Sequence, residues 1–262
     1  MRERSLIRLA TRRARACLAS AASAGGRRIV PAALGTWALL AVAPFEREKD
    51  PIEVGLVIAF LVLSLALHEV AHGWVALQRG DPTARDLGRL SLNPIVHIDP
   101  IWTLIVPLVT YWTSGFIFGG AKPVPVNYYR LKHPLRDMAL VAVAGPATNL
   151  LLGLLFMLAW KAAVFVGPYE PTQLLPRVLE QVAFFNVLLA VFNLIPIPPL
   201  DGSRVMAWLL PPGLRATYVG LEQIGMVIIV GLVLFVDPFK AFLWSGIEAT
   251  WGLLQTLTGG AW

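Results

Sequence analysis

One apolar run, residues 52–78, limits what this chain can fold into more than any other segment. A helix needs about 20 apolar residues to cross the hydrocarbon of a bilayer, and this run is long enough. It nevertheless contains the pattern HEVAH, with His68, Glu69 and His72. A carboxylate in the middle of a membrane helix costs about 2.5–3.5 kcal/mol on insertion scales. The surrounding leucines and valines offer no counter-ion, so we expect the three polar side chains to face a protein interior and to have a function.

Other apolar segments make the rest of the chain equally suited to a bilayer. The 262 residues are 56% hydrophobic and only 15% charged, whereas soluble domains are about 25% charged. The sequence therefore predicts an all-α polytopic membrane protein with about six transmembrane or re-entrant helical segments. Besides 52–78, these segments lie at about 30–45, 101–119, 138–166, 179–198 and 219–236, with a weaker one at 239–256.

The loops predict an orientation and one departure from helix. Loop 79–100 carries three arginines and loop 120–137 carries four lysines and arginines, and the positive-inside rule, which counts these residues, places both loops in the cytosol. This requires segment 101–119 to re-enter the membrane from the cytosolic side, and its prolines and glycines fit a broken path. A plain crossing is the alternative. We expect segment 118–129, FGGAKPVPVNYY, to be a short extended strand or hairpin near the membrane surface, because Pro123 and Pro125 exclude helix.

Most of the net charge lies in the first 28 residues. They hold eight arginines against Glu3, a charge of +7 within a chain total of +6. We interpret them as a cytosolic tail that faces anionic lipid, not as a nucleic-acid-binding segment. An organelle transit peptide has the same composition and is the alternative. The predicted organisation is a tail over 1–29, a membrane-embedded domain over 30–256 and a short tail over 257–262. The predicted location is the cell (inner) membrane, or an organelle membrane if the tail is a transit peptide.

The HEVAH pattern predicts a metal site with hydrolytic chemistry. On a helix, residues at i and i+4 lie about 40° apart, so His68 and His72 face the same way. Glu69 is angled away and can reach a metal-bound water without taking a coordination position. Two histidine ligands and a glutamate base on one helix are the arrangement of HExxH zinc sites. The single Cys17 excludes a cysteine-based site.

Zinc in a catalytic site needs a third protein ligand and an open position. No glutamate occurs between residues 70 and 169, so a downstream glutamate at ordinary spacing is excluded. Asp201 lies in FNLIPIPPLDGSR, residues 192–204, where three prolines interrupt an apolar helix. Irregular backbone at membrane depth is tolerated where it is buried in protein or lines a cavity. We predict Asp201 as the third ligand, with His97 and Asp99 of HIDP as the alternative.

These motifs together resemble the site-2 protease family of intramembrane zinc metalloproteases. HEVAH and NLIPIPPLDG carry the resemblance, and LGRLSLNPIVHIDP, GGAKPVPVN and AGPATN extend it over residues 52–205. The resemblance implies one zinc ion per chain, held by His68, His72 and Asp201, with Glu69 as general base. It also implies that Asn149 steadies the substrate or the oxyanion, for which helix packing is the alternative. Nothing resembles the PDZ or CBS domains of some relatives, so we expect a minimal form.

The predicted activity is hydrolysis of peptide bonds in transmembrane-helix substrates, at a site toward the cytosolic side. The predicted partners are a transmembrane protein substrate and the lipid bilayer, and the oligomeric state is left open. A membrane metal-ion carrier is the alternative from another class, because intramembrane histidines and aspartates also mark ion paths. Against the carrier, this sequence shows no repeated pair of broken helices of the kind that many transporters have. A family member that binds membrane proteins without cleaving them is the third interpretation.

Overall fold

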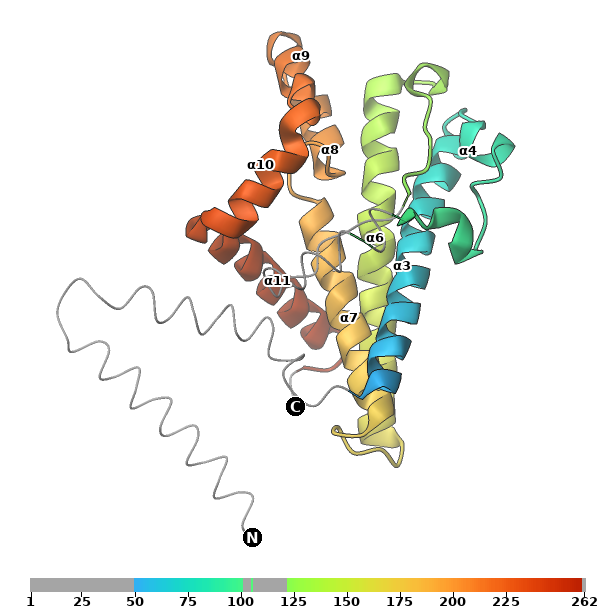
Figure 1. Cartoon of the computed structure of the whole chain (residues 1–262), viewed down its shortest axis with the longest axis vertical. Helices are drawn as coiled ribbons and strands as arrows, with labels where there is room; N and C mark the ends of the chain where they lie inside the picture. Colours follow the sequence, from blue (N-terminus) through green and yellow to red (C-terminus); the bar gives the residue numbers. More distant parts are fainter. Residues whose placement is uncertain (1–49, 101–104, 106–121, 261–262) are drawn as a thin grey trace, which may run out of the picture. The chain divides into compact units, whose positions relative to one another are not determined.

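The computed structural model describes residues 50–100, 105 and 122–260, and among them all regular structure is helical (Figure 1). The all-α prediction is confirmed for these residues. The predicted tail 1–29, segment 30–45 and nearly all of segment 101–119 lie outside them. The long helices are α3 (Pro51–Gln78), α6 (Pro134–Lys161), α7 (Leu174–Asn193) and α11 (Asp237–Leu257). The short ones are α4 (Thr83–Asp86), α8 (Gly202–Leu209), α9 (Pro212–Gly220) and α10 (Glu222–Phe235), with single turns at Pro94–His97, Tyr128–Arg130 and Ala162–Val166.

Three of these helices are long and apolar enough to cross a membrane: α3, α6 with its π-helical continuation to Val166, and α7. Helices α9 and α10 meet at 69° and make a fourth if the bent pair is one broken span. Helix α11, which covers the weak segment 239–256, is not among them. The prediction of about six segments is therefore not confirmed by the described residues, which hold three or four.

The candidate spans begin and end where local chemistry stops a helix. Asp50 caps α3, because its Oδ1 accepts a hydrogen bond from Ile52 N–H at 2.9 Å and Pro51 follows at the first helical position. At the other end of α3, Gly80 adopts a φ of +106°, which terminates the helix as glycine commonly does. Helix α7 ends before the prolines at 196, 198 and 199, which cannot continue its hydrogen bonding.

Helices α3, α6 and α7 run side by side and make the centre of the bundle (Figure 1). Each of these helices buries small residues, among them Ala66, Gly153 and Ala183, and α6 and α7 are so close that a Cβ on Gly153 would lie 3.4 Å from the Ala183 carbonyl oxygen. Small side chains let helix backbones approach closely, which is how helices associate in lipid, where the hydrophobic effect adds little. On the side of α7 away from α3, an apolar cluster joins α6 and α7 to α10 and α11 through Met157, Val187, Ile229 and Ile247.

Residues 122–127 are not helical, as predicted from their prolines, but they pair with no strand in the described part of the chain. Their backbone N–H groups bond elsewhere: Lys122 N–H to the His97 carbonyl at 2.8 Å, Val124 N–H to Glu69 Oε2 at 2.7 Å and Asn127 N–H to Asp81 Oδ2 at 2.5 Å. The prolines at 123 and 125 contribute no donor. The predicted strand or hairpin is therefore not confirmed: two of these six residues are prolines, which have no N–H to donate, and three of the other four donate to a loop carbonyl or to side chains.

Candidate active site

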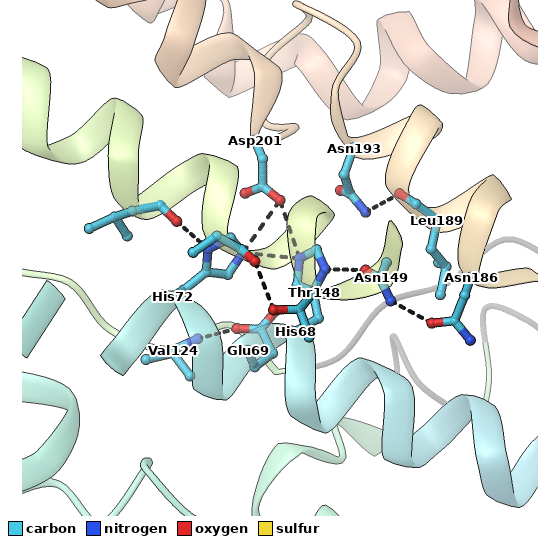
Figure 2. A network of polar contacts seen from close by, with 12 residues as sticks. His68, Glu69, His72, Val124, Thr148, Asn149, Asn186, Leu189, Asn193 and Asp201 are labelled. Atoms are coloured by element: carbon cyan, nitrogen blue, oxygen red, sulfur yellow. Dashed lines mark hydrogen bonds and ion pairs between the residues drawn. The ribbon is translucent and has the colours of Figure 1, made fainter. Parts of the chain in front are cut away.

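The two histidines of HEVAH lie on one face of α3 and are buried in the bundle (Figure 2). Only 5% of His68 and 8% of His72 is exposed. Their Nε2 atoms are 3.0 Å apart, as the helical i, i+4 spacing predicts. The costly polar pair in an apolar helix is thus shielded inside the protein.

Asp201 approaches the histidines from a segment far along the chain. Its Oδ2 lies 3.2 Å from His68 Nε2 and 3.4 Å from His72 Nε2 (Figure 2). The ligand atoms of these three residues all lie within 4.8 Å of one another, and they are the one such cluster found among the described residues. The alternative residues of HIDP are not part of it. The buried His97 instead bonds the Ser91 carbonyl through Nε2 at 2.9 Å.

The far ring nitrogen of each histidine has a partner that fixes its proton. His72 Nδ1 lies 2.7 Å from the Val141 carbonyl oxygen, which only accepts, so Nδ1 carries the hydrogen and Nε2 a lone pair. His68 Nδ1 lies 2.5 Å from Asn149 Oδ1, which accepts in the same way. Three acceptor atoms, two imidazole nitrogens and a carboxylate oxygen, therefore converge. Such a set repels itself unless a cation or a proton lies between.

The two histidines favour the ionised form of the Asp201 carboxyl. Burial by itself would raise the pKa of Asp201. Its hydrogen bonds and charge interactions with His68 and His72 together have the larger effect and lower the pKa to about 2. The carboxylate is therefore ionised at neutral pH, which is the state that binds metals.

Helix α6 leaves room for an ion beside the histidines because Gly145 has no side chain. A Cβ placed on Gly145 would lie 2.4 Å from His68 Nε2 and 2.5 Å from His72 Nε2. Any larger residue would therefore collide with the Nε2 atoms of both histidines. Two imidazole nitrogens and one carboxylate oxygen, with space beside them, suit a catalytic zinc that keeps a fourth position for water. The residues present fit the zinc ion that the sequence predicts.

Close backbone contacts position the loop that carries Asp201. A Cβ on Gly202 would lie 2.1 Å from the Leu194 carbonyl oxygen, so α8 starts directly against the end of α7. A Cβ on Gly225 would lie 1.9 Å from the Pro198 carbonyl oxygen, so α10 lies against the same loop. The loop is thus held from both sides by backbone, which only glycine permits at these distances.

Glu69 lies beside the cluster without joining it. Its side chain is half-buried, and its Oε2 accepts the hydrogen bond from Val124 N–H (Figure 2). This agrees with the helical geometry, which angles position 69 away from the face that carries the histidines. The carboxylate therefore lies next to a ligand residue on α3 without being one of the three clustered ligands.

Asn149 lies inside the bundle beside His68. It is fully buried, its Oδ1 faces His68, and its Nδ2 donates to Asn186 Oδ1 at 2.9 Å. Both ends of its amide are therefore engaged inside the bundle. Asn186 and Gly145 were not assigned a role from the sequence. An asparagine within an apolar segment was the signal available for Asn186, since a polar side chain there needs a partner.

Comparison with known proteins places this arrangement in a family. The model of peptidase family M50 matches residues 169–236. YwhC of Bacillus subtilis is 38% identical over 72% of this chain and 84% of its own length. Rip2 of Mycolicibacterium smegmatis is 30% identical over 70% of this chain and 67% of its own length, and Rip2 of Mycobacterium tuberculosis is 31% identical with the same coverage. No solved structure matches. These relatives bear zinc metalloprotease names, which favours an enzyme over a metal-ion carrier. The chain belongs to peptidase family M50, the site-2 protease family of zinc metalloproteases.

Proposed function

We propose that this chain is an intramembrane protease that cleaves transmembrane-helix substrates, with one zinc ion held by His68, His72 and Asp201. The observation that carries the proposal is the convergence of three ligand atoms, within 4.8 Å, from α3 and from the loop after α7. Both helices are long and apolar enough to cross a membrane. A hydrolytic centre built between such helices acts on peptide bonds that lie in or beside the bilayer.

Glu69 is the residue to which we assign proton transfer. Bound zinc would lower the pKa of its water toward about 7 and polarise the scissile carbonyl. Glu69 takes the proton of the attacking water and returns it to the leaving amine. The Val124 N–H group bonds Oε2 at 2.7 Å and so orients the carboxylate. Oε1 is therefore the oxygen that we assign to the transfer.

The depth of the site supports a position toward the cytosolic face. His72 lies six residues before Gln78, the end of α3, which is about 9 Å at 1.5 Å per residue. Asp201 follows the end of α7. The loop after α3 carries Arg79, Arg85 and Arg89, and the positive-inside rule, which counts Lys and Arg, favours a cytosolic position for it. We therefore propose a cell-membrane protein with a cytosol-facing site, or an organelle protein if residues 1–28 are a transit peptide.

The substrate must expose a peptide bond that is normally enclosed. The amides of a transmembrane helix are bonded within the helix, since lipid offers no partner. Local unwinding is required before water can attack a carbonyl. Substrates with glycine or proline near the scissile bond are therefore expected to be cleaved faster than those with uninterrupted helices.

Cleavage of a model transmembrane substrate by the purified protein tests the proposal. Glu69→Gln should abolish cleavage while zinc content stays near one ion per chain, because the residue lies beside the ligand cluster and not in it. A zinc chelator should abolish cleavage by the unmodified protein, and added zinc should restore it. Wild-type cleavage by Glu69→Gln, or loss of zinc from this variant, would show that the role assigned to Glu69 is wrong.

A further inference from the structure

A chain of hydrogen bonds leads from His68 away from the candidate metal site into the bundle (Figure 2). Asn149 on α6 donates from Nδ2 to Asn186 Oδ1 on α7 at 2.9 Å, and Asn186 donates from Nδ2 to Ser64 Oγ on α3 at 3.0 Å. All three side chains are at most 1% exposed. Ser64 lies one helical turn before His68 on the same face of α3. The chain therefore starts and ends on the helix that carries the histidines.

One backbone carbonyl sets the direction of every bond in this chain. Asn186 Nδ2 also donates to the Val182 carbonyl oxygen at 2.9 Å, and a carbonyl only accepts. The amide of Asn186 must therefore turn its nitrogen toward Val182 and its oxygen toward Asn149. Asn149 must then present its nitrogen to Asn186 and its oxygen to His68. His68 is left to donate from Nδ1, which keeps the lone pair on Nε2.

The opposite arrangement is unfavourable at each step. If Nδ1 of His68 were the acceptor, both asparagine amides would have to turn over, and Asn186 Oδ1 would face the Val182 carbonyl oxygen. Two acceptors would then meet in a buried site, where an unsatisfied polar group costs about 1–3 kcal/mol. This chain of hydrogen bonds from His68 through Asn149 and Asn186 to Ser64, called the relay below, therefore selects the His68 tautomer that can bind a metal through Nε2. His72 reaches the same tautomer directly, through the Val141 carbonyl.

We propose that Asn149 and Asn186, with Ser64 behind them, are positioning residues for the metal ligand His68. They fix the proton on Nδ1 and the orientation of the ring, so that Nε2 points at the ion. This inference rests on the proposed zinc site. It assigns Asn149 to a ligand histidine and not to the substrate. It also gives a role to two polar residues that the motifs do not explain.

Zinc affinity of the purified protein, measured by competition with a chromophoric chelator, tests the relay without using activity. Asn149→Leu should weaken zinc binding roughly 10- to 100-fold, the usual effect of removing a partner of a metal-bound histidine. Asn186→Leu should weaken it less, because Asn186 acts through Asn149. Asn149→Asp should stay within a few-fold of the unmodified protein, since a neutral carboxyl at this buried position can accept from His68 Nδ1 through one oxygen and donate to Asn186 Oδ1 through its hydroxyl.

Thr148→Ala is the matched control for Asn149. Thr148 is the neighbouring residue on α6, and its hydroxyl donates to the Ala144 carbonyl within the same helix at 2.9 Å. Its removal should leave zinc affinity unchanged. If Asn149→Leu does not give folded protein, Asn149→Ser replaces it, because a serine side chain at this position is too short to reach His68.

Combining the substitutions separates positioning from packing. In the Asn149→Leu background, Asn186→Leu should change zinc affinity no further, because the link to His68 is already broken. Additive effects, or an Asn149→Asp variant as weak as Asn149→Leu, would overturn the relay. His72→Ala in the same assay separates a failure of the proposed metal site from a failure of the relay. If it keeps zinc, the proposed metal site is wrong. If it loses zinc while Asn149→Leu binds normally, only the relay is wrong.

Discussion

The candidate site joins a regular half and an irregular half. His68, Glu69 and His72 lie on α3, a helix of 28 residues, whereas Asp201 lies in the loop between α7 and α8. The helix places its residues by its own period, with partners on α6 that orient the rings. The loop depends on contacts from α7 and α10 at Gly202 and Gly225. A substitution in the elements that support the loop should therefore displace Asp201 more easily than a substitution elsewhere displaces the histidines.

The largest effect is expected from removing the loop's own ligand. Loss of a hydrogen-bond partner of a metal ligand can lower affinity up to roughly 100-fold. Asp201→Ala should lower zinc affinity by more than this, because it removes one of the three converging ligand atoms themselves. Equilibrium zinc affinity, or elemental analysis after dialysis, measures this. His97→Ala and Asp99→Ala should keep their zinc, since neither residue belongs to the cluster. Full zinc in Asp201→Ala together with loss in His97→Ala would move the third ligand to HIDP.

An intermediate effect is expected where α10 supports the loop. Gly225→Ala places a Cβ 1.9 Å from the Pro198 carbonyl oxygen, so either α10 or the loop must shift. We expect a lower Tm and weaker zinc binding than in the unmodified protein. Gly231→Ala is the matched control on the same helix, because nothing lies within 4 Å of the added Cβ. It should keep zinc affinity and be as stable or more stable, since alanine favours helix over glycine by about 1 kcal/mol. Equal behaviour of the two variants would contradict the support assigned to α10.

The smallest effect is expected at the far end of the regular half. Asp50→Ala removes the N-cap of α3, whose Oδ1 accepts from Ile52 N–H at 2.9 Å. Loss of such a cap costs about 1 kcal/mol, so the Tm should fall slightly. Zinc affinity should not change, because several turns of helix separate the cap from His68. A substantial loss of zinc would show that α3 does not hold its histidines independently of its ends.

The residues of the regular half could be predicted from local sequence. The spacing of His68 and His72 and the offset of Glu69 are properties of any α-helix, and the structure has them as expected. The all-helical class of the described residues also follows from long apolar segments. Non-helical backbone at Pro123 and Pro125 was predictable for the same local reason, but the partners of this segment were not: Glu69 and Asp81 accept from backbone donors that a hairpin would have used.

The remaining features depend on how the helices pack. Spacing along the chain does not predict that Asp201 meets the histidines. The neighbouring prolines and the family resemblance singled out Asp201. Only the packing of the helices brings its Oδ2 to 3.2 Å from His68 Nε2. The orientation of Asn149 toward His68 and the relay through Asn186 required α3, α6 and α7 to be placed side by side. Local sequence determines which face of a helix a residue occupies, because helical period is a short-range property. Which faces meet is decided by close packing of small side chains between helices, and that is a property of the whole fold.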